Sequence, residues 1–328
     1  MVPKIPNIPQ WGFVSGRISV LEARFLSREF FLSIINQERI EDTVPHLQDT
    51  FLKDYLNPGF VWEDFSALFD KYFYDVALSL RGNCPSTIPV DIFLLQNDYL
   101  NLKSALTGNT TYTFPTGLFS QEKLLAVAHE DYAELPQSLR ESAGLTASEV
   151  YEVAPGILDI ILDGAYLRHL LFLAKEMESE MIGTYVRERV LAYIVIILWR
   201  AVNRGIPLKR YQQYLVPIGD FTPIVSELAG MNNPETWPTA IGGVTGDFFA
   251  ESFEFEEDDQ ISGFDSKVTN HLTKVAHNGR YQTAGPERVF SFLAGLNVEM
   301  QNLKLVVTGK LNRIDRNLLK ERLKDCYV

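Results

Sequence analysis

The sequence predicts an all-α protein assembled from tandem helical repeats. Three observations support this fold class: a segment that is written twice, apolar stripes with helical spacing in both copies, and a weaker third copy between them. The segment reads NDYLNLKSALTGN at its first appearance and NVEMQNLKLVVTGK at its second, so that Asn101 and Lys103 return 201 positions later as Asn302 and Lys304. A repeat of this kind is typical of a fold built from repeated structural units, and it is weaker evidence for an active site.

The first repeat is expected to open with an amphipathic segment at Arg17–Gln37. A shorter helical pattern, HLQDTFLKDYL, follows this segment, and Pro58-Gly59 then breaks the chain. The next stretch, Glu63–Leu80, carries apolar residues at near-helical spacing. These residues are Phe65, Leu68, Phe73 and Val76.

Both copies of the repeated segment end a predicted helix, which we call a signature helix. Its apolar positions form one stripe with spacings of four and three, which indicates a helix that packs against other helices. Pro89 and Pro286 stand near the expected starts, and Gly108 and Gly309 just past the expected ends, as helix boundaries favour. We therefore expect two helices of about 20 residues, each about 30 Å long. Their stripes are Ile88, Ile92, Leu95, Tyr99, Leu102, Leu106 and Val289, Leu293, Leu296, Met300, Leu303, Val307.

The second repeat is expected to begin near Ser120, a plausible N-cap. It continues through a helical stretch at Asp159–Met181 to a third signature helix at Tyr185–Gly205. A shift of 93 positions supports this third copy, because it aligns Asp70-Lys-Tyr-Phe with Asp163-Gly-Ala-Tyr and Thr107 with Arg200. The middle helix keeps only part of the apolar stripe, because Glu188 occupies one core position. It also lacks the polar residues of the other two copies. Leu191, Ile194 and Ile196 stand where Asp98, Asn101 and Lys103 would fall.

The third repeat follows a break at Arg204–Pro207. It contains a loop-rich stretch, an acidic run at Glu251–Asp259, the last signature helix and a final segment, NLLKERLKDCYV. The letters FFAESFEF alternate weakly, so a strand, a loop and a short helix all remain open there. The predicted repeat domains are 1–113, 114–207 and 208–328.

Composition narrows the classes of function. The chain of 328 residues is 46% hydrophobic, which is ample for a core, and its net charge of −12 argues against nucleic acid as the main partner. Cys84 and Cys326 form no metal or disulfide pattern, which fits free thiols in a reducing cytoplasm. The start lacks the pattern of a signal peptide, and the longest apolar run, Val190–Trp199, has half the length of a membrane crossing. We expect a buried helix there and a protein that is not exported.

No catalytic, cofactor or metal site is expected. None of the five histidines has a glutamate three residues before it, and no His-Glu-x-x-His motif occurs, so helical metal sites of these kinds have no support. Thr308-Gly309-Lys310 resembles the end of a phosphate loop but lacks the earlier glycine and the hydroxyl residue after the lysine. An enzyme would need unlike titratable groups that converge in a pocket.

The polar residues of the signature helices are interpreted as structural. Asp98 and Lys103 lie about 70° to either side of the apolar seam, where side chains usually bond neighbouring helices or helix ends. Glu299 and Lys304 repeat this arrangement. The predicted structural residues are Asp98, Asn101, Lys103, Arg200, Glu299, Asn302 and Lys304.

The acidic run at Glu251–Asp259 is interpreted as a solvated surface, with contact to a basic partner as the alternative. Its candidate interface residues are Glu254, Glu256 and Asp258.

At this level of detail the chain resembles the C subunits of bacterial and archaeal V/A-type ATPases, a family that includes the d subunit of the eukaryotic vacuolar enzyme. The resemblance lies in GRISVLEARFLSREFF, HLQDTFLKDYL, the Asp-x-x-Asn-Leu-Lys pattern, RERVLAYIVIILWRA and PERVFSFLAGLNVEMQNLKLVVTGKLNRI followed by ERLKDCYV. These segments span nearly the whole chain. The closing segment is the most specific, and the middle one departs most.

The resemblance implies a funnel of three helical domains around a pseudo-threefold axis. Such a subunit is a non-catalytic socket between the membrane rotor ring and the central shaft, peripheral at the cytoplasmic face of the membrane, and it supports ATP-linked proton or sodium transport without a cofactor of its own. Its partners would be ring and shaft proteins rather than lipid, nucleic acid or a small substrate. A freestanding helical-repeat scaffold with an unrelated partner is the alternative, and an all-α enzyme is a second one.

Overall fold

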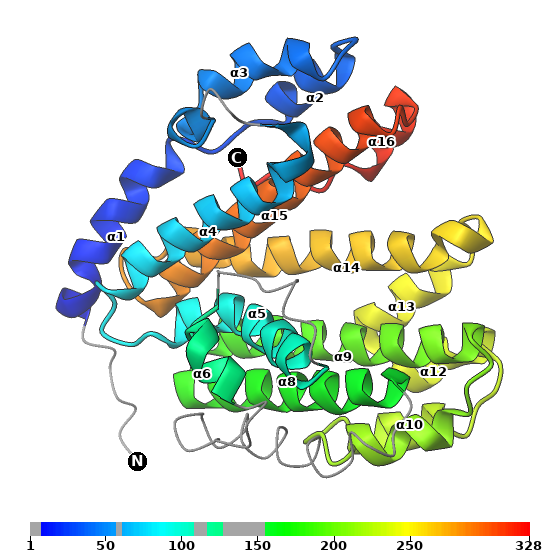
Figure 1. Cartoon of the computed structure of the whole chain (residues 1–328). Coiled ribbons are helices and arrows are strands. Elements are labelled where there is room, and N and C mark those ends of the chain that lie inside the picture. The colour runs from blue at the N-terminus through cyan, green and yellow to red at the C-terminus, as the bar shows by residue number, and fades with distance from the viewer. Residues whose placement is uncertain (1–7, 57–60, 108–116, 127–154) are drawn as a thin grey trace. The chain divides into compact units, whose positions relative to one another are not determined.

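The computed structural model describes residues 8–56, 61–107, 117–126 and 155–328 (Figure 1). The regular elements in these ranges are helices, apart from an isolated bridge between Ile218 and Asp220. The all-α prediction is therefore confirmed. No helix in the described ranges combines the length and the apolar character that a membrane crossing needs.

The chain divides into two compact units. Unit 1 comprises Met1–Val90 and Thr269–Val328, and unit 2 comprises Asp91–Val268. Unit 1 thus combines parts of the first and third expected repeats. This division does not test the repeat boundaries, which stay a prediction.

Unit 1 is built around α15 (Pro286–Leu311), which packs against helices from the other end of the chain. These are α1 (Ile8–Glu22), α2 (Arg28–Asn36) and α4 (Phe65–Arg81) (Figure 1). Every residue of the predicted stripe of α15 is buried, and so are most of the other residues of this helix. Shorter elements complete the unit: α3 (Val44–Gln48), the 3-10 turns at Glu41–Thr43, Phe51–Asp54, Trp62–Asp64 and Asn278–Tyr281, and α16 (Arg316–Arg322).

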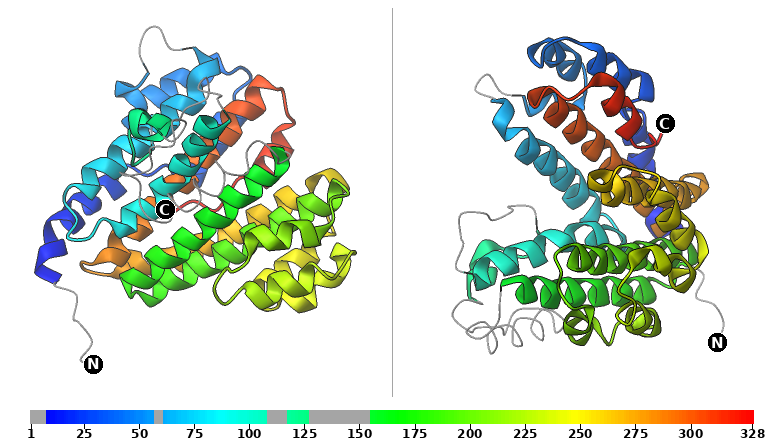
Figure 2. Two further views of the ribbon diagram at one scale, coloured as in Figure 1. Left: turned by 60° about the horizontal axis from the view of Figure 1, so that its bottom comes forward. Right: turned by 90° about the vertical axis from the view of Figure 1, so that its right-hand side faces the viewer.

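Unit 2 is built around two long helices, α8 (Pro155–Met177) and α9 (Glu180–Asn203). The turn between them is short, with Glu178 at a positive φ and Ser179 accepting a hydrogen bond from Ile182 N, so the helices run antiparallel and side by side (Figure 2). Most of α5 (Ile88–Leu106) belongs to this unit. The other elements are α6 (Gln121–Ala126), α10 (Leu208–Leu215), α11 (Thr222–Leu228), α12 (Trp237–Ile241), α13 (Gly243–Ser252), the 3-10 turns at Pro234–Thr236 and Glu257–Asp259, and α14 (Gln260–His277), which continues into unit 1.

The three signature helices are present as α5, α9 and α15. The expected break after the last one is wrong, because Gly309 lies inside α15, two residues before the helix ends. A Cβ atom on Gly309 would lie 2.3 Å from the Leu319 side chain, so the glycine permits close packing of α16. The backbone reversal falls instead at Arg313, with a φ of 55°. Gly108 lies outside the described residues.

Two further segments differ from the expectation or decide between alternatives. The segment at Arg17–Gln37 forms the end of α1 and α2 with a break between them, because Ser27 caps a new helix by accepting a hydrogen bond from Phe30 N. The FFAESFEF stretch, Phe248–Phe255, is helical to Ser252 and then turns. Much of the second repeat's start, residues 127–154 with LPQSLRESAG, lies outside the described residues.

Gly295 of α15 provides a stability test for unit 1. A Cβ atom there would lie 2.4 Å from the ring of Tyr327, whereas a Cβ atom on Gly16 of α1 would meet nothing within 4 Å. We expect Gly295→Ala to destabilise the protein by about 1–3 kcal/mol through overpacking. The matched Gly16→Ala should stabilise it by up to about 1 kcal/mol, since alanine is the better helix former. Thermal unfolding followed by circular dichroism measures both, and an equal or higher melting temperature for Gly295→Ala than for Gly16→Ala would contradict the packing.

Candidate functional site

Two signature helices hold a main-chain amide just ahead of another helix. The buried carboxylate of Glu299 on α15 accepts a hydrogen bond from Leu26 N at 2.6 Å, and Asp98 on α5 accepts one from Phe119 N at 3.0 Å. Leu26 lies two residues before α2, and Phe119 lies two residues before α6. The two amides are 93 positions apart, the shift that aligns the first two repeats. The same contact therefore recurs at equivalent positions.

The start of each following helix repeats as well. Ser27 Oγ accepts a hydrogen bond from Phe30 N at 3.3 Å, and Ser120 Oγ accepts one from Lys123 N at 3.3 Å. The two serines are again 93 positions apart. The predicted N-cap at Ser120 is confirmed, and the matching caps support the repeat independently of the apolar stripes.

The lysines of the two signature helices bind aspartates on neighbouring helices. Lys304 of α15 contacts Asp70 of α4 at 2.6 Å, and Lys103 of α5 forms an ion pair with Asp159 of α8. Asp159 lies one helical turn before Asp163, the residue that aligns with Asp70. Each pair is about one-third exposed or more, so each adds about 0–1 kcal/mol.

The asparagines of the signature helices lie against segments of the same chain. Asn302 donates to the carbonyl oxygen of Lys324 at 3.1 Å and accepts from its amide at 2.9 Å, which fixes the C-terminal segment to α15. Asn101 is buried beside Gly117, where a Cβ atom would lie 2.2 Å from Asp98 Oδ1 and 3.5 Å from Asn101 Nδ2. Asp98, Asn302 and the two lysines thus each contact other segments of the same chain.

Burial raises the pKa of Glu299 well above its usual range, and the hydrogen bond from Leu26 N opposes this shift. The side chain is only 4% exposed. The neutral acid of Glu299 therefore persists to a higher pH in the folded chain than in the unfolded one.

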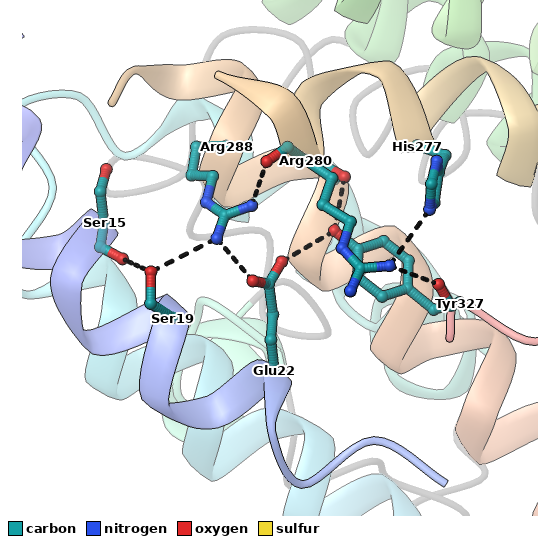
Figure 3. A network of polar contacts seen from close by, with 8 residues as sticks. Ser15, Ser19, Glu22, His277, Arg280, Arg288 and Tyr327 are labelled. Atoms are coloured by element: carbon teal, nitrogen blue, oxygen red, sulfur yellow. Dashed lines mark hydrogen bonds and ion pairs between the residues drawn. The ribbon is translucent and has the colours of Figure 1, made fainter. Parts of the chain in front are cut away.

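A polar network that the sequence did not predict joins α1, α15 and the C-terminal segment (Figure 3). Arg288 binds Glu22 at 2.5 Å, and both side chains are about one-tenth exposed. The Tyr327 hydroxyl donates to Glu22 Oε1 at 3.0 Å, and Arg280 donates to the Tyr327 carbonyl oxygen at 3.2 Å. No spacing rule connects these residues, which lie up to 305 positions apart. The network pairs the buried charges of Arg288 and Glu22 and fixes the C-terminal segment to α1 through Tyr327.

The middle signature helix differs from the other two. Ile194 and Ile196 of α9 are buried and Leu191 is half-buried, in place of the acid, the amide and the lysine. Further along the chain, at and just after the end of α9, Arg200 and Arg204 are exposed. Within the described residues neither guanidinium has a hydrogen bond or an ion pair.

These two arginines line a cavity of about 320 Å³ between α5, α8, α9 and α10. Lys103, Asp159 and Asp163 line it too, together with tyrosines and aliphatic side chains. Desolvation raises the pKa of Asp163 to about 6, and Asp159 adds to this shift, whereas Lys103 and Arg200 oppose it. The Asp163 carboxylate reaches the solvent of the cavity, so the surrounding protein, not complete enclosure, causes the desolvation.

The acidic run is exposed in the structure. Glu254 and Glu256 lie between the end of α13 and the 3-10 turn at Glu257–Asp259, and Asp258 lies in that turn. Within the described residues none of the three carboxylates has a hydrogen bond or ion pair. Glu251, at the start of the run, is bound by Lys267 of α14 at 2.5 Å. Among the described residues no group of three or more histidine, cysteine or acidic side chains is placed to hold a metal ion.

Two comparisons with known proteins cover nearly the whole chain. The family model of the ATP synthase (C/AC39) subunit matches residues 14–322, a range that includes all three signature helices. The C subunit of the V-type sodium ATPase from Enterococcus hirae is 24% identical over 330 residues, which covers 93% of this chain and 95% of that protein.

The amide contact of Glu299 can be tested by two substitutions. Glu299→Ala leaves Leu26 N without its acceptor and should cost about 1–3 kcal/mol of unfolding free energy. Glu299→Gln keeps an acceptor oxygen and should cost far less. Because the pKa of Glu299 is raised on folding, the wild-type side chain contributes least to the free energy of unfolding at high pH. The free energy of unfolding of Glu299→Gln should therefore rise relative to that of the wild type as pH rises. Urea unfolding at pH 6 and pH 8.5 measures this; equal losses for both variants would refute the contact.

Asp163 gives a second pH-dependent prediction. Its pKa is raised on folding, so its stabilising contribution is complete below the unfolded pKa near 4 and is lost as pH rises through about 6. Asp163→Asn should therefore raise the melting temperature at pH 8 and change it little at pH 4. A melting difference that is independent of pH would show that Asp163 ionises normally.

Proposed function

Because the chain belongs to the ATP synthase (C/AC39) subunit family, we propose that it is a non-catalytic central-stalk subunit of a rotary V/A-type ATPase. In this role it is a socket that couples the rotor shaft to the membrane ring during ATP-linked proton or sodium transport. The family match over residues 14–322 is the observation that supports the proposal most strongly. The relative from Enterococcus hirae, the C subunit of a V-type sodium ATPase, agrees with it.

The mechanism is mechanical. An adaptor between a ring and a shaft must transmit torque without deforming, and close-packed helix seams resist deformation. The long buried seam of α15 meets this demand, and so do the contacts of Glu299, Asn302 and Lys304 that fix it to neighbouring segments. The chain would support rotation by transmitting it, while ATP hydrolysis and ion movement occur in other subunits.

The partners follow from this role. We infer that the shaft and the ring bind to protein surfaces of this chain, which sits at the cytoplasmic face of the membrane through the complex. The three repeats would surround the tip of the shaft as a funnel, with similar helices facing it. The exposed acidic run at Glu254, Glu256 and Asp258 is the candidate surface for a basic partner.

The proposal is tested in the complete complex. Membranes that lack this subunit should lose ATP-driven ion pumping while the nucleotide-binding subunits still hydrolyse ATP, and added wild-type chain should restore pumping. The tagged chain should also co-purify with ring and shaft subunits. Co-purification with an unrelated partner alone, or pumping that persists without the subunit, would refute the role and favour a freestanding scaffold.

The acidic surface has its own test. Changing Glu254, Glu256 and Asp258 to lysine should weaken binding to the ring or the shaft, most clearly at low salt, because exposed charges are screened as salt rises. A matched control changes three other exposed acids to lysine: Glu176, Glu227 and Glu235. Unchanged binding of the first variant to both partners would remove the acidic run from the interface.

A further inference from the structure

The three signature helices use their polar residues differently. In α5 and α15 the acidic and basic side chains bind amides or aspartates of the same chain, as Asp98, Glu299 and Lys304 show. In α9 these positions are apolar, and two arginines, Arg200 and Arg204, stand at and just after the C-terminal end of the helix. Arg187 of α9 binds Asp220, and Arg189 donates to Gln96 and Tyr166. The guanidinium groups of Arg200 and Arg204, by contrast, take part in no hydrogen bond or ion pair within the described residues.

The two arginines form one continuous feature. They are four residues apart at the end of α9, one helical turn or about 6 Å along the axis, so they lie on the same face. Both line the cavity of about 320 Å³ and both are exposed. Lys103 lines it too, but its charge is offset by Asp159. The guanidinium groups of Arg200 and Arg204 have no ion-pair partner among the described residues that line the cavity.

Asp163 is the opposing charge in this cavity. It has no hydrogen bond or ion pair within the described residues, although it lies within electrostatic range of Arg200. Counting Lys103, Arg200 and Arg204 against Asp159 and Asp163, the charged lining is net positive by one. A ligand that brings a carboxylate beside a hydrogen-bond donor would satisfy both the arginines and Asp163.

We propose that Arg200 and Arg204 bind carboxylate side chains on a segment of the shaft that enters this cavity. The inference rests on the proposed function and adds the chemistry of the contact. Guanidinium groups bind carboxylates through two parallel hydrogen bonds, and two of them one turn apart match two acidic side chains one turn apart on a partner helix. The volume suits a few side chains of a partner, and Tyr193, Tyr211 and Ile197 offer their apolar parts.

The test is the affinity of the full chain for purified shaft subunits. Arg200→Glu with Arg204→Glu should weaken shaft binding about 10- to 100-fold. Arg200→Lys with Arg204→Lys keeps the charge without the planar fork and should fall between this variant and wild type. Lys209→Glu with Arg210→Glu on α10 makes the same change in net charge outside the cavity lining and should bind the shaft nearly as wild type does. Reversal of a shaft acid to lysine should partly rescue the first variant.

The outcomes separate the two proposals. Failure of the wild-type chain to bind the shaft would overturn the socket role and this inference together. Wild-type binding that the glutamate variant retains, with an unchanged melting temperature, would overturn the inference alone. Titration with inorganic phosphate covers the other source of anions: phosphate that binds the wild type, is lost in the glutamate variant and does not compete with the shaft would show a small-anion site instead.

Discussion

The described structure depends on one kind of contact, a buried carboxylate that accepts a hydrogen bond from the amide ahead of a helix. An amide buried there without an acceptor would cost about 1–3 kcal/mol. Asp98 and Glu299 each remove this cost at equivalent places, and Ser120 and Ser27 then start the helices that follow. The contact fixes where the following helix begins relative to the signature helix of the same unit.

The middle copy shows what happens when this contact is absent. Leu191 and Ile194 replace the acid and the amide, and α9 instead relies on apolar burial along α8 and α13. Arg187 and Arg189 in the first half of α9 still bind neighbouring segments through Asp220, Gln96 and Tyr166. Arg200 and Arg204 have no hydrogen bond or ion pair within the described residues, whereas the lysines of α5 and α15 are engaged.

Periodicity was sufficient to predict the signature helices and the buried stripe of α15, because a seam of apolar residues leaves a regular pattern in the sequence. It misplaced the stripe of α4, where the predicted residues are half-buried and Phe69, Tyr72, Ala77 and Leu80 are buried. It also placed Asp98 and Lys103 on opposite shoulders of the α5 seam. It could not reveal that Lys103 binds Asp159, that Arg200 and Arg204 share a cavity, or that Glu22 meets Arg288 and Tyr327, since these pairs depend on which helices become neighbours. Gly309 was misplaced because close packing and helix termination both favour glycine.

The composition of unit 1 bears on the order in which the chain folds. Unit 2 is one continuous stretch, Asp91–Val268, and all of it has been synthesised before α15 appears. The apolar faces of the amino-terminal helices α1, α2 and α4 lack their partner, α15, until the ribosome has made the last sixty residues. We therefore expect the central part of the chain, unit 2, to become compact first on the ribosome. A chain that is terminated before α15 leaves the apolar faces of α1, α2 and α4 exposed, and chaperones would have to bind them.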